Sequence, residues 1–346
     1  MSHSRLRLSA KSRFRAQLFL AFLAGCFFLL LLVVLKTRWA PVVAGAEPLQ
    51  DQRGDSIRAY TISRIKGYEN VTPLLSIDRV KESTRLKPLK EEVTRIIDSL
   101  KQAGFLEEAS VYFKELDRGA WISVNANAQY HPASLMKVCL LIGYLKIAQS
   151  DPALLRQKWV FNKPDSVQIN PQYYQAPSIQ PGKAYTLHDL LYHMVAYSDN
   201  NATWLLASHF DNRLLKKIFA DLGLPEPVDN ESAFTMTALD YSIFYKVIYN
   251  SGYLSAEFSE YAAELLSHST FQEGFGQAFP KGTKMYRKFG EWRLSGQDYE
   301  LHESGVFFIK NTPFLLTVMT RGKDTPRMAG AIRAISKKVY EMVSPP

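Results

Sequence analysis

Ser134-Leu135-Met136-Lys137 opens an apolar stretch, residues 138–147, whose length and composition are typical of a buried helix. At the start of a helix, residues three apart lie on one face, so the Lys137 amine can reach the Ser134 hydroxyl. A serine hydroxyl needs such a base to act as a nucleophile, and the N–H groups at a helix N-terminus can stabilise an oxyanion. The same pattern also arises where a serine caps a helix and a lysine faces solvent. The motif alone therefore does not distinguish a nucleophile from a helix cap, and the rest of the chain must decide between them.

The residues before this stretch predict a helix followed by a hairpin. Apolar residues recur at helical spacing up to residue 100, with Pro88 near the start and Gly104 past the end, where these residue types favour helix boundaries. Two apolar runs, residues 111–113 and 121–124, then flank the turn sequence Asp117-Arg118-Gly119.

The residues after the central helices return to strands. Residues 305–309 and 314–319 are separated by a turn at Asn311-Thr312-Pro313, and a last helix places Met328 and Ile332 on one face. This order predicts an α+β fold, a mainly antiparallel sheet flanked by both terminal helices, with an inserted all-helical subdomain.

Two further short motifs lie in chemically informative places. Ser198-Asp199-Asn200 stands between two apolar helical stretches, a position where these residues most often form a plain turn and helix cap. Lys288-Phe289-Gly290 stands at the beginning of the returning strands, where it can run along an edge strand beside the site.

The three motifs in this order resemble those of the class A β-lactamases and their penicillin-binding relatives, whose set is S-x-x-K, S-D-N and K-[ST]-G. The resemblance extends over about residues 86–345, and Phe279-Pro280-Lys281-Gly282 is similar to the family's turn before the third motif. It implies a β-lactamase/transpeptidase-like serine hydrolase that forms an acyl-serine with a β-lactam or a peptidoglycan-type amide, without a cofactor or metal.

The resemblance also implies roles for individual residues. Two lysines that converge on one serine repel each other, which helps to keep Lys137 neutral enough to act as a base. The implied roles are Ser134 as nucleophile, Lys137 as its base, Ser198 as a proton relay helped by Lys288, Asn200 and Gly290 in substrate binding, and the backbone N–H groups of Ser134 and Glu291 as the oxyanion hole.

Phe289 is the first departure from the family pattern. It replaces a hydroxyl residue that hydrogen-bonds the substrate carboxylate in the family, so the recognition of penicillins as anions is in doubt. Arg287, Arg293 and His302 are candidates to substitute for it, although an exposed surface position is more typical of each residue type.

The second departure is the lack of the family's E-x-x-L-N segment, which carries the deacylating glutamate. Between residues 224 and 237 the acidic residues are Glu226, Asp229 and Glu231, and Glu226, held between two prolines, is the candidate for deacylation. Without an ordered base for water, an acyl-enzyme persists, as in a penicillin-binding protein. The alternative is a catalytically weak or inactive member that binds cell-wall peptide or an envelope partner.

The N-terminal residues predict a membrane anchor. Residues 18–35 carry no charge and give about 27 Å of helix, with five basic residues before them and two after. The positive-inside rule then places residues 1–17 in the cytoplasm, residues 36–85 in an extracytoplasmic stalk and residues 86–346 in a periplasmic domain. Two alternatives stay open, signal cleavage near Ala44-Gly45-Ala46 and lipidation of Cys26.

The net charge of +9 reflects this anchor. Seven of the 42 basic residues lie within the first 40 positions, so the rest of the chain carries 35 basic and 33 acidic residues. A nearly neutral body argues strongly against phosphate-driven binding of nucleic acid, and we expect none as a partner. Cys26 and Cys139 are the two cysteines, so no disulfide forms within the exported part, which we expect to be a monomer.

Overall fold

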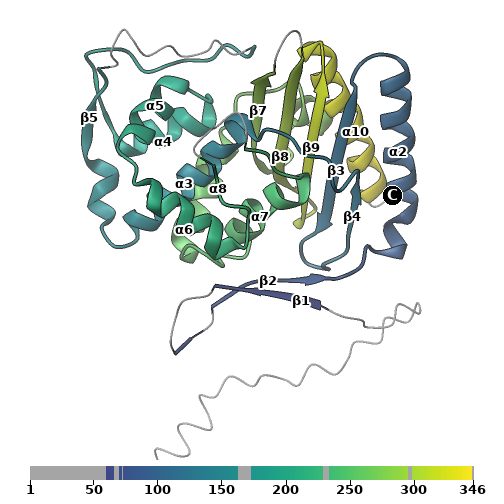
Figure 1. The fold of residues 1–346 in the computed structure, drawn as a ribbon, viewed down its shortest axis with the longest axis horizontal. Coiled ribbons are helices and arrows are strands. Elements are labelled where there is room, and N and C mark those ends of the chain that lie inside the picture. The colour runs from purple at the N-terminus through teal and green to yellow at the C-terminus, as the bar shows by residue number, and fades with distance from the viewer. Residues whose placement is uncertain are drawn as a thin grey trace, which may run out of the picture. The chain divides into compact units, whose positions relative to one another are not determined.

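A five-stranded antiparallel sheet separates two apolar cores (Figure 1). The computed structural model describes residues 60–65, 70–71, 73–162, 173–228, 234–294 and 298–344, all of which fall within the unit Arg58–Pro346. The strand order is β4-β3-β9-β8-β7, which leaves β7 at an edge. The strands are β3 (Glu108–Glu115), β4 (Trp121–Val124), β7 (Met285–Arg293), β8 (Tyr299–Ile309) and β9 (Thr312–Gly322).

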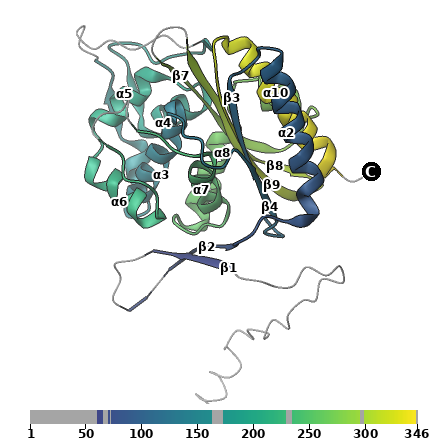
Figure 2. The same cartoon turned by 45° about the vertical axis from the view of Figure 1, so that its right-hand side comes forward.

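The two terminal helices cover one face of the sheet (Figure 2). Helix α2 (Lys87–Gln102) begins with a proline in its first turn and buries Leu89, Val93 and Ile97, which recur at helical spacing. Helix α10 (Thr325–Val343) is capped by Asp324, whose carboxylate accepts the Arg327 N–H. The short helix α9 (Phe275–Ala278) joins them in the same core.

The other face is covered by helices from the middle of the chain (Figure 2). Helix α3 (Met136–Ala148) lies at their centre and is buried almost all round, as its predominantly apolar sequence predicts. A Cβ at Gly143 would stand 2.3 Å from the Phe210 ring, so only glycine permits this packing. The others are α4 (Leu187–Ala196), α5 (Asn200–Ser208), α6 (Asn212–Leu222), α7 (Ala238–Tyr249) and α8 (Ala256–Ser267). Short 3-10 turns precede α2, α3 and β5; they are η1 (Thr84–Leu86), η2 (Ala133–Leu135) and η3 (Pro152–Arg156).

Two small two-stranded antiparallel sheets complete the fold, β1 (Tyr60–Arg64) with β2 (Leu74–Arg79) and β5 (Lys158–Val160) with β6 (Ala184–Thr186). The first lies within the predicted stalk, and Leu75 joins the core beside the helices. The predicted membrane helix, residues 18–35, lies outside the described residues, and no helix among those described is long and apolar enough to cross a bilayer.

The sequence predicted the α+β architecture correctly, but it made the last two strands too short. Strands β8 and β9 have 11 residues each, because polar residues such as Glu300, His302 and Thr320 are buried within the sheet and interrupt the apolar pattern. The turn between them lies at Lys310 and Asn311, whose positive φ angles of 46° and 68° suit a tight hairpin turn.

Candidate active site

Ser134 lies in the 3-10 turn η2, directly before helix α3, and lines a cleft of about 1110 Å³. The preceding residue, Ala133, has a φ of +51°, a region that costs a non-glycine residue on the order of 1–3 kcal/mol. Such a backbone persists only where its surroundings hold it. The turn before Ser134 is therefore a fixed feature of the site.

Lys137 lies in the first turn of helix α3, and 4% of its surface is exposed. Its Nζ atom donates to the Ser198 carbonyl at 2.6 Å, to Asn200 Oδ1 at 2.7 Å and to Ser198 Oγ at 3.1 Å. Burial lowers the pKa of Lys137 to about 7, although the nearby Asp199 charge opposes this change. Near neutral pH, the neutral amine is therefore present in a large fraction of the molecules. In that state the Ser198 hydroxyl can rotate and donate to the nitrogen lone pair.

The Ser198-Asp199-Asn200 loop joins α4 to α5. Ser198 is fully buried and has a φ of +56°, while Asn200 lines the cleft. Asp199 holds the loop, because its carboxylate accepts hydrogen bonds from Ser178 Oγ and from the backbone N–H groups of Ile179 and Asn201. Burial raises the pKa of Asp199, but the neighbouring His193 side chain and these hydrogen bonds outweigh burial and leave the pKa below its usual value.

Lys288 and Gly290 point from edge strand β7 toward the nucleophile turn. The Lys288 side chain is fully buried, and its Nζ donates to the Phe289 carbonyl at 2.8 Å. Burial, together with the charge of Lys137, holds the pKa of Lys288 well below its ordinary value. A Cβ at Gly290 would lie 2.9 Å from the Pro132 carbonyl and 3.0 Å from Leu135 N, so the strand fits against the turn only with glycine.

Phe289 points to the opposite face of the same strand and is 1% exposed. Its ring stacks on Phe271 with the centroids 4.3 Å apart, and the edge of Tyr174 meets it at 5.6 Å. The residue in the hydroxyl position of the third motif is thus a core residue. Phe289 is not among the described residues that line the cleft.

Two of the three proposed substitutes for that hydroxyl are buried, which corrects the expectation that they are exposed. Arg287 forms a buried ion pair with Glu303, and His302 lies within the sheet, because both belong to strands whose polar residues pair with one another. Arg293 is exposed and lines the cleft, with its guanidinium 5.8 Å from the centre of the Tyr299 ring. It is the cation on β7 that a substrate anion can reach.

The segment Tyr173–Ile179 connects the second and third motifs. Tyr174 packs on Phe289, and the backbone N–H of Tyr173 donates to both oxygens of Glu291 at 2.8 and 3.1 Å. At the other end, the Ile179 N–H binds Asp199. The sequence did not reveal this segment, since no motif marks it.

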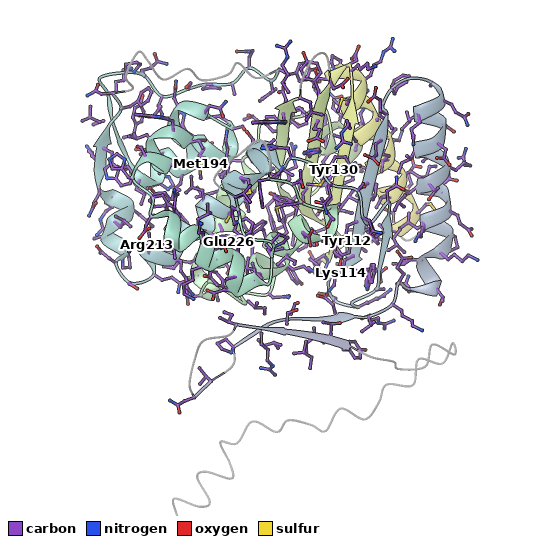
Figure 3. The ribbon with its side chains drawn as sticks, in the orientation of Figure 1. Tyr112, Lys114, Tyr130, Met194, Arg213 and Glu226 are labelled. Carbon is purple, nitrogen blue, oxygen red and sulfur yellow. The ribbon has the colours of Figure 1, made fainter. Side chains whose placement is uncertain are left out.

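The candidate acids occupy different parts of the site. Glu291 lines the cleft, and burial raises its pKa, against the opposing effect of the Tyr173 N–H. Glu226 is exposed and forms an ion pair with Lys216 of α6 at 3.1 Å; Figure 3 labels it among the helices. Among the described residues that line the cleft, Glu291 is the only carboxylate. Asp229 and Glu231 lie outside the described residues.

The structure therefore brings all three motifs to one place. Ser134, Lys137, Asn200 and Glu291 line the cleft, while Ser198 and Lys288 are buried, Ser198 in contact with Lys137 and Lys288 on the neighbouring strand. Within the described parts of the chain, no group of three or more His, Cys, Asp or Glu side chains is arranged to hold a metal ion.

Sequence reasoning missed the residues that support the nucleophile turn. These are His131, Trp292 and Glu300, together with His302, which the sequence offered only as a substitute for the hydroxyl of the third motif. Two signals were available, the position of His131 three residues before Ser134 and the period-2 spacing of Glu300 and His302 in a strand.

Known proteins share this architecture. The sequence model described as the β-lactamase enzyme family matches residues 88–343. No curated protein sequence matches the chain.

Among solved structures, a β-lactamase from Chitinophaga pinensis is 16% identical, with a TM-score of 0.65 over 75% of this chain and 100% of that chain. A class A β-lactamase from Mycobacterium abscessus is 18% identical, with a TM-score of 0.61 over 73% and 98% of the two chains. The structure of PBP-A is 22% identical, with a TM-score of 0.60 over 74% and 96%. At these identities the likeness concerns the fold.

Proposed function

The chain belongs to the β-lactamase enzyme family, and on this basis we propose that it is a serine hydrolase that forms an acyl-enzyme at Ser134. The substrate is a β-lactam or a peptidoglycan-type amide. The observation that carries the proposal is the buried Lys137 amine, whose pKa is lowered to about 7 and which contacts Ser198 and Asn200. A base with a pKa near the working pH is well suited to activating a serine hydroxyl.

The proposed acylation follows from these positions. Lys137 Nζ takes the proton of Ser134 Oγ, which attacks the substrate carbonyl carbon while the C=O electron pair moves onto oxygen. The N–H groups of Ser134 and Glu291 stabilise this oxyanion. As the C–N bond breaks, the leaving nitrogen takes a proton from Ser198 Oγ, which regains one from Lys137. Lys288 contributes positive electrostatic potential beside this relay whenever it is protonated.

Deacylation is the step for which the site is least equipped. Glu226 is exposed and paired with Lys216, and both carboxylate oxygens of Glu291 accept the Tyr173 N–H. Among the described residues, neither arrangement leaves a carboxylate dedicated to activating water as a general base. We therefore propose an acyl-enzyme that turns over slowly, which is penicillin-binding rather than penicillinase behaviour. One comparison structure is an acyl-enzyme complex of a PBP-A variant with penicillin G.

Labelling of the purified full chain tests this function. It is incubated with a fluorescent penicillin and, separately, with a chromogenic cephalosporin, beside Ser134→Ala. Stable labelling that Ser134→Ala abolishes supports slow turnover, whereas rapid cephalosporin hydrolysis supports a β-lactamase. If neither substrate reacts and a fluorophosphonate probe leaves Ser134 unmodified, the catalytically silent alternative is correct.

We also propose that residues 18–35 anchor the protein in the cell membrane, with residues 1–17 in the cytoplasm and the domain of residues 86–346 outside it. The support is the uncharged run and the seven basic residues around it. Protease added to intact spheroplasts should remove the domain, and mass spectrometry of the purified protein should find an intact N-terminus. A mature N-terminus near residue 46 would show signal cleavage, and one at residue 26 would show lipidation.

A further inference from the structure

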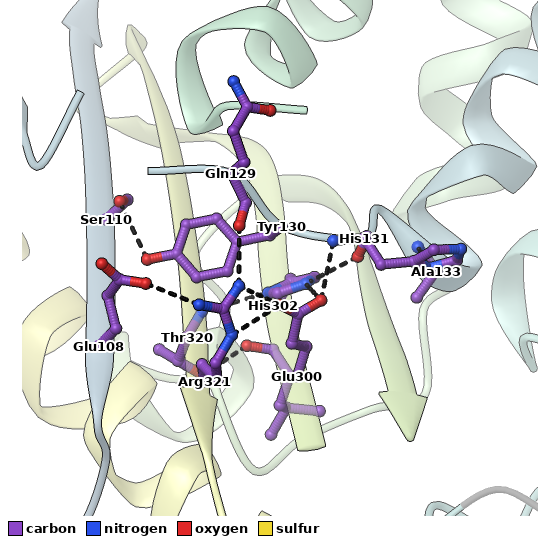
Figure 4. Close-up of polar contacts among 11 residues, drawn as sticks. Glu108, Ser110, Gln129, Tyr130, His131, Ala133, Glu300, His302, Thr320 and Arg321 are labelled. Atoms are coloured by element: carbon purple, nitrogen blue, oxygen red, sulfur yellow. Dashed lines mark hydrogen bonds and ion pairs between the residues drawn. The ribbon is translucent and has the colours of Figure 1, made fainter. Parts of the chain in front are cut away.

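Three hydrogen bonds hold the backbone just before the nucleophile (Figure 4). The His131 N–H donates to Glu300 Oε2 at 2.8 Å, and the His131 carbonyl accepts from His302 Nε2 at 3.0 Å. The Ala133 N–H donates to the ring nitrogen His131 Nδ1 at 3.0 Å. Pro132 has no N–H, so each N–H of residues 131–133 has a partner.

The carboxylate and the imidazole that hold His131 are themselves fixed. Glu300 Oε1 accepts from Arg321 Nη2 at 2.7 Å and from Nε at 3.0 Å, so the carboxylate is oriented from both sides. His302 Nδ1 accepts the Thr320 N–H at 3.1 Å, which leaves Nε2 to carry the proton that it donates to His131. Burial lowers the pKa of His302 to about 3, so the ring stays neutral in this tautomer.

The His131 ring also touches the strand that carries the third motif. It stacks on Trp292, with centroids 3.7 Å apart and planes inclined by 16°. Trp292 directly follows Glu291, whose N–H is one proposed oxyanion donor, and Ala133 directly precedes Ser134, whose N–H is the other. One buried imidazole therefore contacts the neighbour of each donor.

We propose that His131 is a positioning residue that sets the spacing of the two oxyanion N–H groups, by accepting the Ala133 N–H and stacking on Trp292. The inference rests on the proposed acylation of Ser134. The positive φ of Ala133 needs such a constraint, because a strained backbone relaxes where its N–H is unpaired. Glu300 and His302 act through His131, since they hold its peptide group and not the substrate.

Two variants of the full-length protein separate the two contacts of the ring. His131→Phe keeps a ring that can stack on Trp292 but removes the acceptor for the Ala133 N–H. His131→Asn keeps an acceptor near the Nδ1 position and removes the stack. The acylation rate constant at saturating fluorescent penicillin is expected to fall on the order of 10- to 100-fold in His131→Phe and less in His131→Asn, because small displacements of catalytic groups have effects of this size.

Trp292→Leu removes the stack, keeps the acceptor for the Ala133 N–H and covers the case in which a His131 variant does not fold. Because Trp292 also lines the cleft, the dissociation constant of the penicillin is measured together with its acylation rate. The matched control of this variant is Trp159→Leu, since Trp159 stacks on His209 at 4.8 Å and is not among the cleft residues. We expect slower acylation in Trp292→Leu and unchanged acylation in Trp159→Leu.

A positioning role and a merely structural role of His131 have different effects on the acylation rate constant and on the dissociation constant of the penicillin. Positioning lowers the acylation rate constant while the non-covalent dissociation constant of the penicillin stays within about twofold. A variant that loses positioning should also bind phenylboronic acid more weakly, by a factor similar to its loss of acylation rate, because the tetrahedral boronate places an oxygen in the oxyanion hole. Loss of stability alone lowers the melting temperature and changes neither constant in the folded protein.

The outcomes separate this inference from the function on which it rests. If the wild type is labelled and both His131→Phe and Trp292→Leu acylate within twofold of it, the inference is wrong and the function stands. If the wild type is neither labelled by penicillin nor inhibited by the boronate, the proposed function is wrong and the inference falls with it.

Discussion

The Lys137 amine lies 2.6 Å from the carbonyl oxygen of Ser198, so the first motif is joined to the second by a buried hydrogen bond. This contact fixes the amine between the nucleophile's helix and the loop that carries the proposed proton relay. Burial between the same elements removes the amine from water, which is the reason for its lowered pKa. Burial between helix α3 and the Ser198 loop thus determines both the position and the basicity of the proposed base.

The acylation rate constant should decrease at acid pH, with the midpoint of this decrease near pH 7. The reactive form of Lys137 is the neutral amine, and burial lowers its pKa to about 7, so the rate constant should fall about tenfold per pH unit below that value. Stopped-flow measurement of labelling by fluorescent penicillin between pH 5 and 9 gives the profile. A rate constant that stays level between pH 5 and 9 would contradict the assignment of Lys137, with its pKa of about 7, as the base.

Stability should rise with pH between about 8 and 10. Burial lowers the pKa of Lys137 and Lys114 to about 7 and that of Lys246 to about 8, so in this range the unfolded chain binds more protons than the folded one. As the pH rises through this range, these lysines lose their protons in the unfolded chain, so protonation no longer favours unfolding. Urea midpoints at pH 8 and 10 measure the change, and Lys114→Met should reduce it. A midpoint that falls over this interval contradicts the assignment.

Asp78→Asn should destabilise the domain by about 2 kcal/mol. Asp78 of strand β2 pairs with both Lys114, labelled in Figure 3, and Lys246, so the change leaves two buried lysines without their carboxylate. Asp98→Asn on the exposed side of α2 is the matched control, with an expected change below about 0.5 kcal/mol. Equal urea midpoints for the two variants would show that the ion pairs of Asp78 contribute nothing to stability.

Gly290→Ala should slow acylation more than tenfold. The new Cβ would stand 2.9 Å from the Pro132 carbonyl and 3.0 Å from Leu135 N, which forces the edge strand away from the nucleophile turn. Gly330→Ala is the control, because its Cβ meets nothing nearer than 3.8 Å and alanine favours the helix. Acylation at the wild-type rate in Gly290→Ala would mean that the strand and the turn are not held together as described.

Phe289→Thr restores the family's hydroxyl but should not improve penicillin acylation. The side chain lies in the core against Phe271, so the change should cost about 3 kcal/mol of stability and place the hydroxyl away from the cleft. Phe105→Thr, at a position that is 37% exposed, is the control and should cost about 1 kcal/mol or less. Faster labelling of Phe289→Thr would show that position 289 faces the substrate.

The architecture and the three motifs could be predicted from the sequence because they are local signals. Helical spacing in α2 and α10, the turn before β4 and the spacing of serine and lysine at α3 each depend on a few neighbouring residues. The prediction that Lys288 runs along an edge strand is confirmed by strand β7.

The supporting contacts could not be predicted, because they join residues far apart in the chain. Glu300 meets the backbone of His131 across 169 positions, and Tyr173 meets Glu291 across 118. Residue type alone also misled, since Arg287 and His302 are typical surface residues that this sheet buries beside compensating partners. A buried polar network of this kind becomes visible only in three dimensions.

The most direct test of the central claim is intact-protein mass spectrometry of the full chain after incubation with penicillin G, followed by peptide mapping. The proposed function predicts an increase by the mass of one penicillin, located on Ser134, and no increase in Ser134→Ala or Lys137→Ala. An unchanged wild-type mass without penicillin hydrolysis, or an adduct that persists in Ser134→Ala, would contradict it.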